Sequence, residues 1–150
     1  YSKFPYTSAK FLLPAANSGL VAADTPYMRS AEMYLIEAEA LARQGKDAEA
    51  IAVFATLEKN RNPSYVTTTS SGDALLNEIL LSRRIELWGE GLRFFDLKRM
   101  NLPLDREKAG NYVTSVINNV YKIDAADKRW NWLIPRPEIN ANPLVEQNPL

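Results

Sequence analysis

The stretch Ala38-Glu-Ala-Leu-Ala-Arg-Gln-Gly45, followed closely by Ala48-Glu-Ala-Ile-Ala-Val-Phe54, decides the fold of this chain. Ala, Glu, Leu and Arg are good helix formers, and Gly45 can take the left-handed conformation that ends a helix. The pattern therefore predicts two helices, over about Tyr27–Gln44 and Asp47–Asn60. Because only two or three residues join them, the two helices should be antiparallel.

The start of the first helix and the small residues on both helices refine this expectation. Thr25 can cap the first helix, and Pro26 fits its first position, where a missing N–H costs nothing. Small residues, a turn glycine, then Ala and an aromatic residue resemble one tetratricopeptide unit. A single unit cannot bury its own faces, so we expect neighbouring helices to cover it.

A third helix is predicted to begin near Asp73, a good capping residue, and to run to about Trp88. Gly89 and Gly91 weaken the helix at that point. A second short helix, Leu92–Met100, should then continue at an angle. We read Trp88, Phe94 and Phe95 as core residues.

The rest of the chain reads as loops and an extended tail. Residues 1–26, 61–72 and 103–131 lack a helical pattern, and residues 132–150 hold four prolines, which exclude a long helix. A short turn is expected at Pro137-Glu138-Ile139. The predicted fold class is therefore mainly α, with a tetratricopeptide-like helix pair, a third broken helix, irregular loops and an extended Pro-rich C-terminal tail.

Composition sets limits on function. The chain has 150 residues, which fits one domain, and its eighteen basic side chains balance eighteen acidic ones. A neutral chain has no general field that attracts nucleic acid. It has neither Cys nor His, which excludes disulfides, thiol nucleophiles and imidazole triads. The first residue is Tyr1 rather than Met, so we expect a processed product or a piece of a longer protein.

Charged residues follow the third predicted helix at helical spacing. Arg83, Glu86, Glu90 and Arg93 are three, four and three residues apart, which places them in one row, and Asp96 follows. The row lies on or beside the apolar stripe, so its charges must be paired. We interpret it as a structural network. The alternatives are a partner contact, or an acid/base pair of Glu86 and Glu90 as in glycosidases. Nearby Arg residues should keep both carboxylates ionised, which disfavours acid chemistry.

Three ordered motifs carry a family resemblance. They are Met28-Arg-Ser-Ala-Glu-Met-Tyr-Leu-Ile-Glu-Ala-Glu-Ala40, then Ile79-Leu-Leu-Ser-Arg-Arg-Ile-Glu-Leu-Trp-Gly-Glu-Gly-Leu-Arg-Phe-Phe-Asp-Leu-Lys-Arg99, then a tail with Ile134-Pro135, Asn142-Pro143 and Gln147-Asn148-Pro149. Together they are similar to the C-terminal portion of SusD/RagB-type outer-membrane lipoproteins. Phe94 stands where the family often has Trp, and the chain stops at Leu150 where the family often continues Gly-Tyr.

The resemblance implies a function that composition does not show. Such proteins are non-catalytic, need no cofactor or metal, and capture oligosaccharides at the cell surface for a SusC-like TonB-dependent outer-membrane barrel. They are held to the outer membrane by an N-terminal lipid anchor that is absent from this chain. The runner-up is a protein-interaction scaffold that docks the barrel without binding sugar. Either way we expect residues 1–150 to be a single domain from the C-terminal part of a larger protein, with 1–26 extended, 27–100 helical, and 101–150 loop and tail.

Sugar sites need flat aromatic faces with polar side chains around them. The candidate ligand-binding residues are Trp130, Trp132, Tyr112 and Tyr121. A Trp-x-Trp spacing in a strand puts both indoles on one face. That arrangement suits ligand contact, and it equally suits anchoring the tail onto the helical core, which is the reading we favour.

Overall fold

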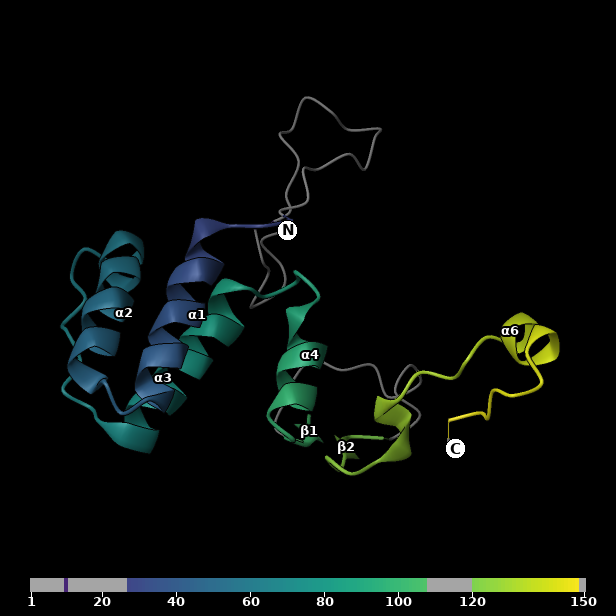
Figure 1. Cartoon of the computed structure of the whole chain (residues 1–150). Helices are drawn as coiled ribbons and strands as arrows, with labels where there is room; N and C mark the ends of the chain where they lie inside the picture. The colour runs from purple at the N-terminus through teal and green to yellow at the C-terminus, as the bar shows by residue number, and fades with distance from the viewer. Residues whose placement is uncertain (1–9, 11–26, 108–119, 149–150) are drawn as a thin grey trace, which may run out of the picture. The chain divides into compact units, whose positions relative to one another are not determined.

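The computed structural model describes residue 10 and residues 27–107 and 120–148. The chain divides into two compact units, Tyr1–Gly91 and Leu92–Leu150. Helices dominate both the described chain and Figure 1, which confirms the mainly α fold class. That residues 1–150 act as a single domain stays a prediction. The expected extended segment 1–26, apart from Lys10, and Tyr112 lie outside the described residues.

The first unit contains the helix pair and the third helix. α1 spans Ser30–Arg43, α2 spans Asp47–Arg61 and α3 spans Gly72–Glu86. Gly45 has φ +73°, the left-handed conformation expected of a glycine that ends a helix. Its amide N–H donates to the Ala42 carbonyl oxygen at 3.0 Å. The short turn lays α2 beside α1, as Figure 1 shows.

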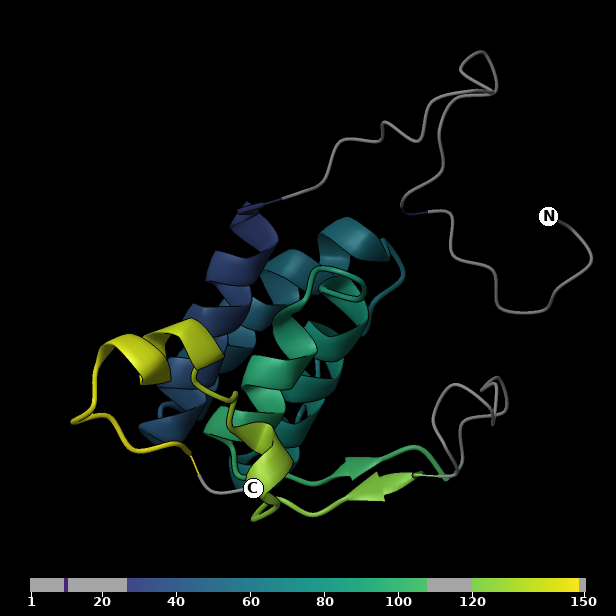
Figure 2. The same cartoon turned by 90° about the vertical axis from the view of Figure 1, so that its right-hand side faces the viewer.

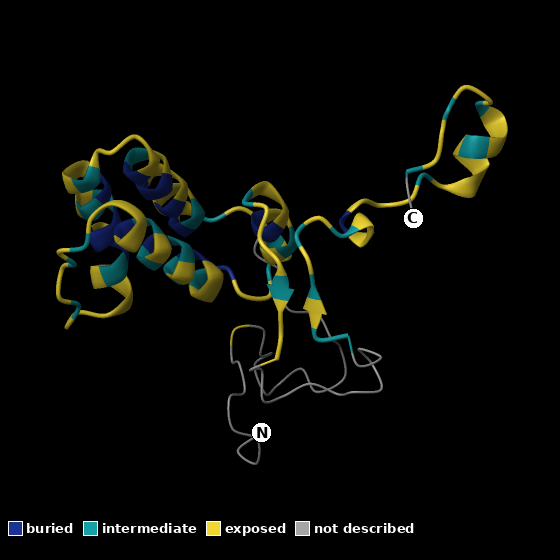
Figure 3. Ribbon diagram, turned by 90° about the horizontal axis from the view of Figure 1, so that it is seen from below, coloured by how far each residue is buried: buried dark blue, intermediate teal, exposed yellow. Residues whose placement is uncertain are grey.

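The core of this unit lies among α1, α2 and α3. Leu35, Leu75 and Ile79 are fully buried, and Figure 3 shows the buried positions on the facing sides of the helices. Small residues let the helices approach closely, while larger ones fill the space between them. The other residues of this buried core are Ala31, Ala38, Ala42, Ala50, Phe54 and Leu57. This is the packing that the small-residue pattern predicts, and α3 is the neighbour that the helix pair needs.

Two helix ends differ from prediction. α1 begins at Ser30 rather than near Pro26, because Arg29 is extended (φ −130°, ψ 143°). α3 ends at Glu86 rather than at Trp88, since Gly89 and Gly91 both have left-handed φ values (+79° and +81°) that interrupt the helix. The predicted row of charges is therefore not one continuous helical row, and Glu90 lies in the turn after α3.

The second unit holds smaller elements, which Figure 2 shows from the side. α4 spans Leu92–Arg99, and α6 spans Arg136–Ala141, where the sequence predicts a short turn. Residues 103–131 are not wholly irregular as expected. β1 (Leu104–Asp105) pairs antiparallel with β2 (Lys122–Ile123) in the register Leu104↔Ile123. A turn of 3₁₀ helix follows over Lys128–Trp130. Strands of two residues have too little pattern for sequence to reveal.

Among the described residues, no helix has the length and apolar character needed to cross a membrane.

Candidate functional site

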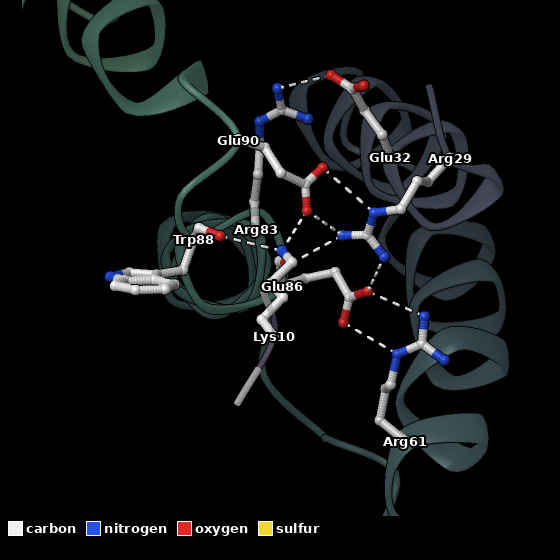
Figure 4. A network of polar contacts seen from close by, with 8 residues as sticks. All are labelled: Lys10, Arg29, Glu32, Arg61, Arg83, Glu86, Trp88 and Glu90. Atoms are coloured by element: carbon white, nitrogen blue, oxygen red, sulfur yellow. Dashed lines mark hydrogen bonds and ion pairs between the residues drawn. The ribbon is translucent and has the colours of Figure 1, made fainter. Parts of the chain in front are cut away.

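Arg29 is the centre of a polar network in the first unit (Figure 4). One guanidinium nitrogen, Nη1, donates to Glu86 Oε1 at 2.7 Å, and Nη2 donates to the Glu86 carbonyl oxygen at 2.8 Å. Nη2 also donates to Glu90 Oε1 at 2.7 Å, and Nε donates to Glu90 Oε2 at 3.2 Å. The extended backbone at Arg29 thus sends its side chain to the end of α3. The planar fork of the guanidinium suits two carboxylates at once.

Glu86 has a second cationic partner at the end of α2. Arg61 donates to Glu86 Oε2 from Nε at 3.0 Å and to Oε1 from Nη2 at 2.9 Å. The hydrogen bond from Arg61 is the largest single influence on the pKa of Glu86. Together with Arg29 it outweighs desolvation and lowers the pKa of Glu86 to about 2. Glu86 is therefore ionised at any neutral or mildly acidic pH.

Glu90 is almost wholly buried, with 6% of its side chain exposed. Burial is the largest single influence on its pKa and would raise it. Hydrogen bonds from Arg29 and Lys10, with their charges, lower the pKa of Glu90 more than burial raises it. Lys10 also donates from Nζ to the carbonyl oxygens of Glu86 (2.8 Å) and Trp88 (3.0 Å). It therefore binds both the carboxylate and the carbonyl groups left open where α3 ends.

Arg83 makes a separate pair in the same region. Its side chain is 7% exposed, and Nη2 donates to Glu32 Oε1 on α1 at 3.1 Å. Figure 4 shows this pair beside the Arg29 cluster. The ion pair ties α3 to α1 across the core.

The predicted row is divided along the chain between the two units. Arg83, Glu86 and Glu90 lie in the first unit. Glu86 and Glu90 share Arg29, whereas Arg83 pairs with Glu32. Arg93 and Asp96 lie in the second unit, where Asp96 is buried and accepts a hydrogen bond from Arg99 Nε at 2.9 Å. Sequence reasoning missed the cations that meet the carboxylates, namely Lys10, Arg29 and Arg61, as well as Glu32. The available signal was the position of Arg29 and Arg61 at the ends of two helices, but their partners are too distant in sequence for spacing to reveal.

The geometry around Glu86 and Glu90 is that of a structural ion-pair network and does not fit general acid/base catalysis. A glycosidase needs one carboxyl that is protonated at working pH. Both Glu86 and Glu90 hydrogen-bond to cations and have lowered pKa values. Neither is available as a general acid. Among the described residues, no group of carboxylates is placed to hold a metal ion.

An aromatic cluster lies in the second unit. The rings of Phe94 and Trp130 have centroids 5.5 Å apart with an interplanar angle of 39°. Trp132 meets the same Phe94 ring edge-to-face at 6.5 Å and 85°. Trp130 is 8% exposed, and its Nε1 donates to the Asp124 carbonyl oxygen at 2.7 Å, whereas Trp132 is 79% exposed.

The strand geometry that would put both indoles on one face does not occur here. Trp130 ends the 3₁₀ turn, so the backbone between the two residues is not a regular strand with a two-residue repeat. One indole anchors the unit and the other faces solvent. Tyr121 is half-buried directly before β2. Trp88 and Phe95, which the sequence suggests as core residues, are 55% and 62% exposed.

The chain end holds Trp132 in place by side-chain hydrogen bonds. Gln147 accepts the Ile134 amide N–H at 2.8 Å and donates to the Ile134 carbonyl oxygen at 3.0 Å. Asn148 Nδ2 donates to the Trp132 carbonyl oxygen at 2.6 Å. These contacts, here called the tail clamp (Gln147 and Asn148 on Trp132 and Ile134), close residues 132–148 into a loop around α6.

Comparison with known proteins then assigns a family. The model of the SusD family matches residues 3–150. The chain belongs to the SusD family. It is 30% identical over 128 residues to a SusD-like protein from Formosa agariphila, covering 80% of this chain and 23% of that protein.

Solved structures agree with this assignment. A SusD superfamily protein from Bacteroides thetaiotaomicron is 34% identical with a TM-score of 0.67, over 87% of this chain and 28% of that one. A SusD-like carbohydrate binding protein from Bacteroides vulgatus is 40% identical with a TM-score of 0.50, over 55% of this chain and 17% of that one. This chain thus spans less than a third of the length of each of these relatives. The sequence-based family prediction is confirmed.

Contacts in the structure explain what residues of the three family motifs do physically. Arg29 of the first motif binds Glu86 and Glu90 of the second. Gln147 and Asn148 of the third motif return to Ile134 and Trp132. The motifs thus mark places where distant parts of each unit are joined by charge-assisted or paired hydrogen bonds.

Proposed function

We propose that this chain is part of a non-catalytic carbohydrate-binding protein of the bacterial cell surface. In this role the protein captures oligosaccharides at the outer membrane and passes them to a TonB-dependent barrel. Membership in the SusD family and likeness to a SusD-like carbohydrate binding protein support the role. The observation that carries it within this chain is the exposed indole of Trp132.

Trp132 has the features of a sugar-stacking platform. Its ring is largely exposed, yet Phe94 contacts it and the tail clamp fixes its backbone. A pre-positioned aromatic ring loses little entropy when a ligand binds. Polar groups lie close by, since Lys98 Nζ donates to the side-chain oxygen of Asn131, the residue next to Trp132, at 3.1 Å. An aromatic face flanked by an amide and an ammonium matches the apolar face and hydroxyl edge of a sugar ring.

A glycan array with this chain tests the proposal. We expect binding to at least one oligosaccharide class, and Trp132→Ala to weaken that binding about tenfold or more, on the order of 1.4 kcal/mol. Trp88→Ala is the matched control, because Trp88 is also an exposed indole but lies in the other unit. If both variants lose the same glycan affinity, or if Trp132→Ala loses none, Trp132 is not part of the sugar site.

The second candidate is a scaffold that docks the barrel without binding sugar. Exposed aliphatic side chains on α3, Leu81 and Ile85, favour it. A chain that binds the purified barrel but no glycan on the array would place this function first.

A further inference from the structure

A groove runs between α2 and α3 in the first unit, with a volume of about 440 Å³. Three of its lining residues on α2 are Phe54, Glu58 and Arg61, and three on α3 are Glu78, Leu81 and Ile85. The spacings are four and three residues on α2, and three and four on α3. Each set therefore forms one ridge along two turns of its helix, and the two ridges are the walls of the groove.

Apolar side chains from both helices line the groove. Leu81 and Ile85 are 56% and 68% exposed, one turn apart on the same side of α3. Phe54, which is buried, also lines the groove and packs edge-to-face on Tyr65 with ring centroids 6.3 Å apart. Two aliphatic side chains at this spacing match the ridge of a further helix, as when an amphipathic helix lies in a groove between two others.

The rim of the groove is acidic. Among the described residues, Glu58, Glu78 and Glu86 line it together with the cation Arg61. Arg61 and Arg29 hydrogen-bond to Glu86. Glu58 accepts a hydrogen bond from the Ser82 hydroxyl, and Glu78 accepts one from the Ser70 hydroxyl. A hydroxyl orients a carboxylate but does not neutralise it. Arg61 interacts with both Glu58 and Glu86, so this cation is shared between two carboxylates and the rim keeps an excess of negative charge.

We propose that this groove docks an amphipathic, basic helix of a protein partner. The helix places apolar side chains against Leu81 and Ile85, and Lys or Arg side chains against Glu58 and Glu78. The proposal does not depend on sugar binding by Trp132, because the groove lies wholly in the first unit and its ligand chemistry is apolar and cationic.

A pair of synthetic peptides tests the proposal on the whole 150-residue chain. Both are helical, about 15 residues long, with Leu at positions i, i+4 and i+7. One carries Lys beside the Leu ridge, and the other carries Glu at the same positions. We expect the Lys peptide to bind at least tenfold more tightly in calorimetry, with weaker binding at high salt. In methyl NMR spectra, the Leu81 and Ile85 signals should shift on binding.

Matched variants locate the interaction. Glu58→Gln combined with Glu78→Gln keeps amides that can still bond Ser82 and Ser70, and should lower the affinity for the Lys peptide about tenfold. Glu37→Gln removes one exposed charge from α1 outside the groove and should leave the affinity unchanged. Leu81→Ser with Ile85→Ser changes only exposed positions and should abolish binding while the helical circular dichroism stays intact.

Three results would overturn the proposal. The first is equal affinity for the Lys and Glu peptides, and the second is no binding of either. The third is concentration-dependent self-association of the chain that Leu81→Ser and Ile85→Ser remove. That last result would make a second copy of this chain the occupant in place of a basic partner helix.

Discussion

At the level of single residues, the guanidinium of Arg29 explains how two carboxylates lie so close together. Glu86 and Glu90 would repel each other if they shared no cation. Arg29 donates to both, Arg61 adds a second cation at Glu86, and Lys10 adds another at Glu90. Each charge thus keeps hydrogen bonds that replace the water lost on burial. The cluster is consequently sensitive to removal of any single member.

The lowered pKa of Glu86 predicts how stability depends on pH. A carboxyl with a folded-state pKa of about 2 against an ordinary value of 4.5 stabilises the fold above pH 4.5, and this contribution is lost as pH falls toward 2. Because Arg61 is half-exposed, we expect a loss of only about 2 kcal/mol over this window. Urea unfolding from pH 6 to pH 2 measures it.

Two variants isolate that contribution. Glu86→Gln should be less stable than the parent at pH 6, and the gap should close as pH approaches 2. Glu37→Gln, at an exposed position on α1, should keep the slope of the parent. A parental slope in Glu86→Gln would assign the acid sensitivity to other carboxyls.

Replacing Arg83 by Met should cost about 3 kcal/mol of unfolding free energy, because a buried ion pair that loses one partner leaves the other uncompensated. Arg83 is 7% exposed and binds Glu32. Its neighbour Arg84 is exposed, so Arg84→Met is the control and should change stability by less than about 0.5 kcal/mol. Chemical denaturation at neutral pH compares the two, and similar small losses in both would show that the Arg83 pair contributes little.

At the level of elements, sequence patterns predicted what local spacing controls. The helix pair, its glycine turn and α2 follow from helix formers and Gly45, and they occur as expected. The start of α1 does not follow, because the extended Arg29 is held by carboxylates about sixty residues away along the chain. Likewise, no local signal separates the buried Trp130 from the exposed Trp132. Their difference arises from the 3₁₀ turn and the Asp124 hydrogen bond.

The turn between α1 and α2 should depend on backbone conformation alone. Gly45 has φ +73°, and nothing lies within 4 Å of the position a Cβ would take. Gly45→Ala should therefore cost about 1–2 kcal/mol through backbone strain without any steric clash. Gly45→Asn should cost less, since Asn tolerates the left-handed region. Thermal unfolding of both variants measures the difference, and equal losses would contradict a purely conformational cause.

The tail clamp should govern local opening around Trp132. Gln147→Ala removes both hydrogen bonds to Ile134, each of net value about 1 kcal/mol. The Ile134 amide should then exchange its hydrogen roughly ten times faster or more. Glu146→Ala, at an exposed neighbouring position, should leave that rate unchanged. Hydrogen exchange by mass spectrometry follows it, and an unaltered rate in Gln147→Ala would show that α6 alone holds the loop.

At the level of the whole molecule, the sequence predicted the SusD family and which residues form the charged network. It did not predict which residues pair with one another. The order of the three motifs along the chain can be read from the sequence alone, and this order was enough to indicate the family. Pairings such as Lys10 with Glu90, or Asn148 with Trp132, depend on three-dimensional folding and span many residues. The exposed positions of Trp88 and Phe95 were not foreseen because large apolar residues in a motif are usually core.

Removal of the tail should affect the second unit and spare the core of the first. Among the described residues, the buried cluster of the first unit comes from α1, α2 and α3, so a chain that lacks residues 132–150 should keep those helices in circular dichroism. In the second unit, loss of Trp132 uncovers the Phe94 ring beside Phe95, which is already exposed. A larger aromatic patch promotes association, so light scattering should show oligomers or aggregates. Trp132→Ala in the intact chain removes the same ring but keeps the clamp, and should aggregate less. A shortened chain that stays monodisperse and as stable as the parent would show that the tail is only a linker.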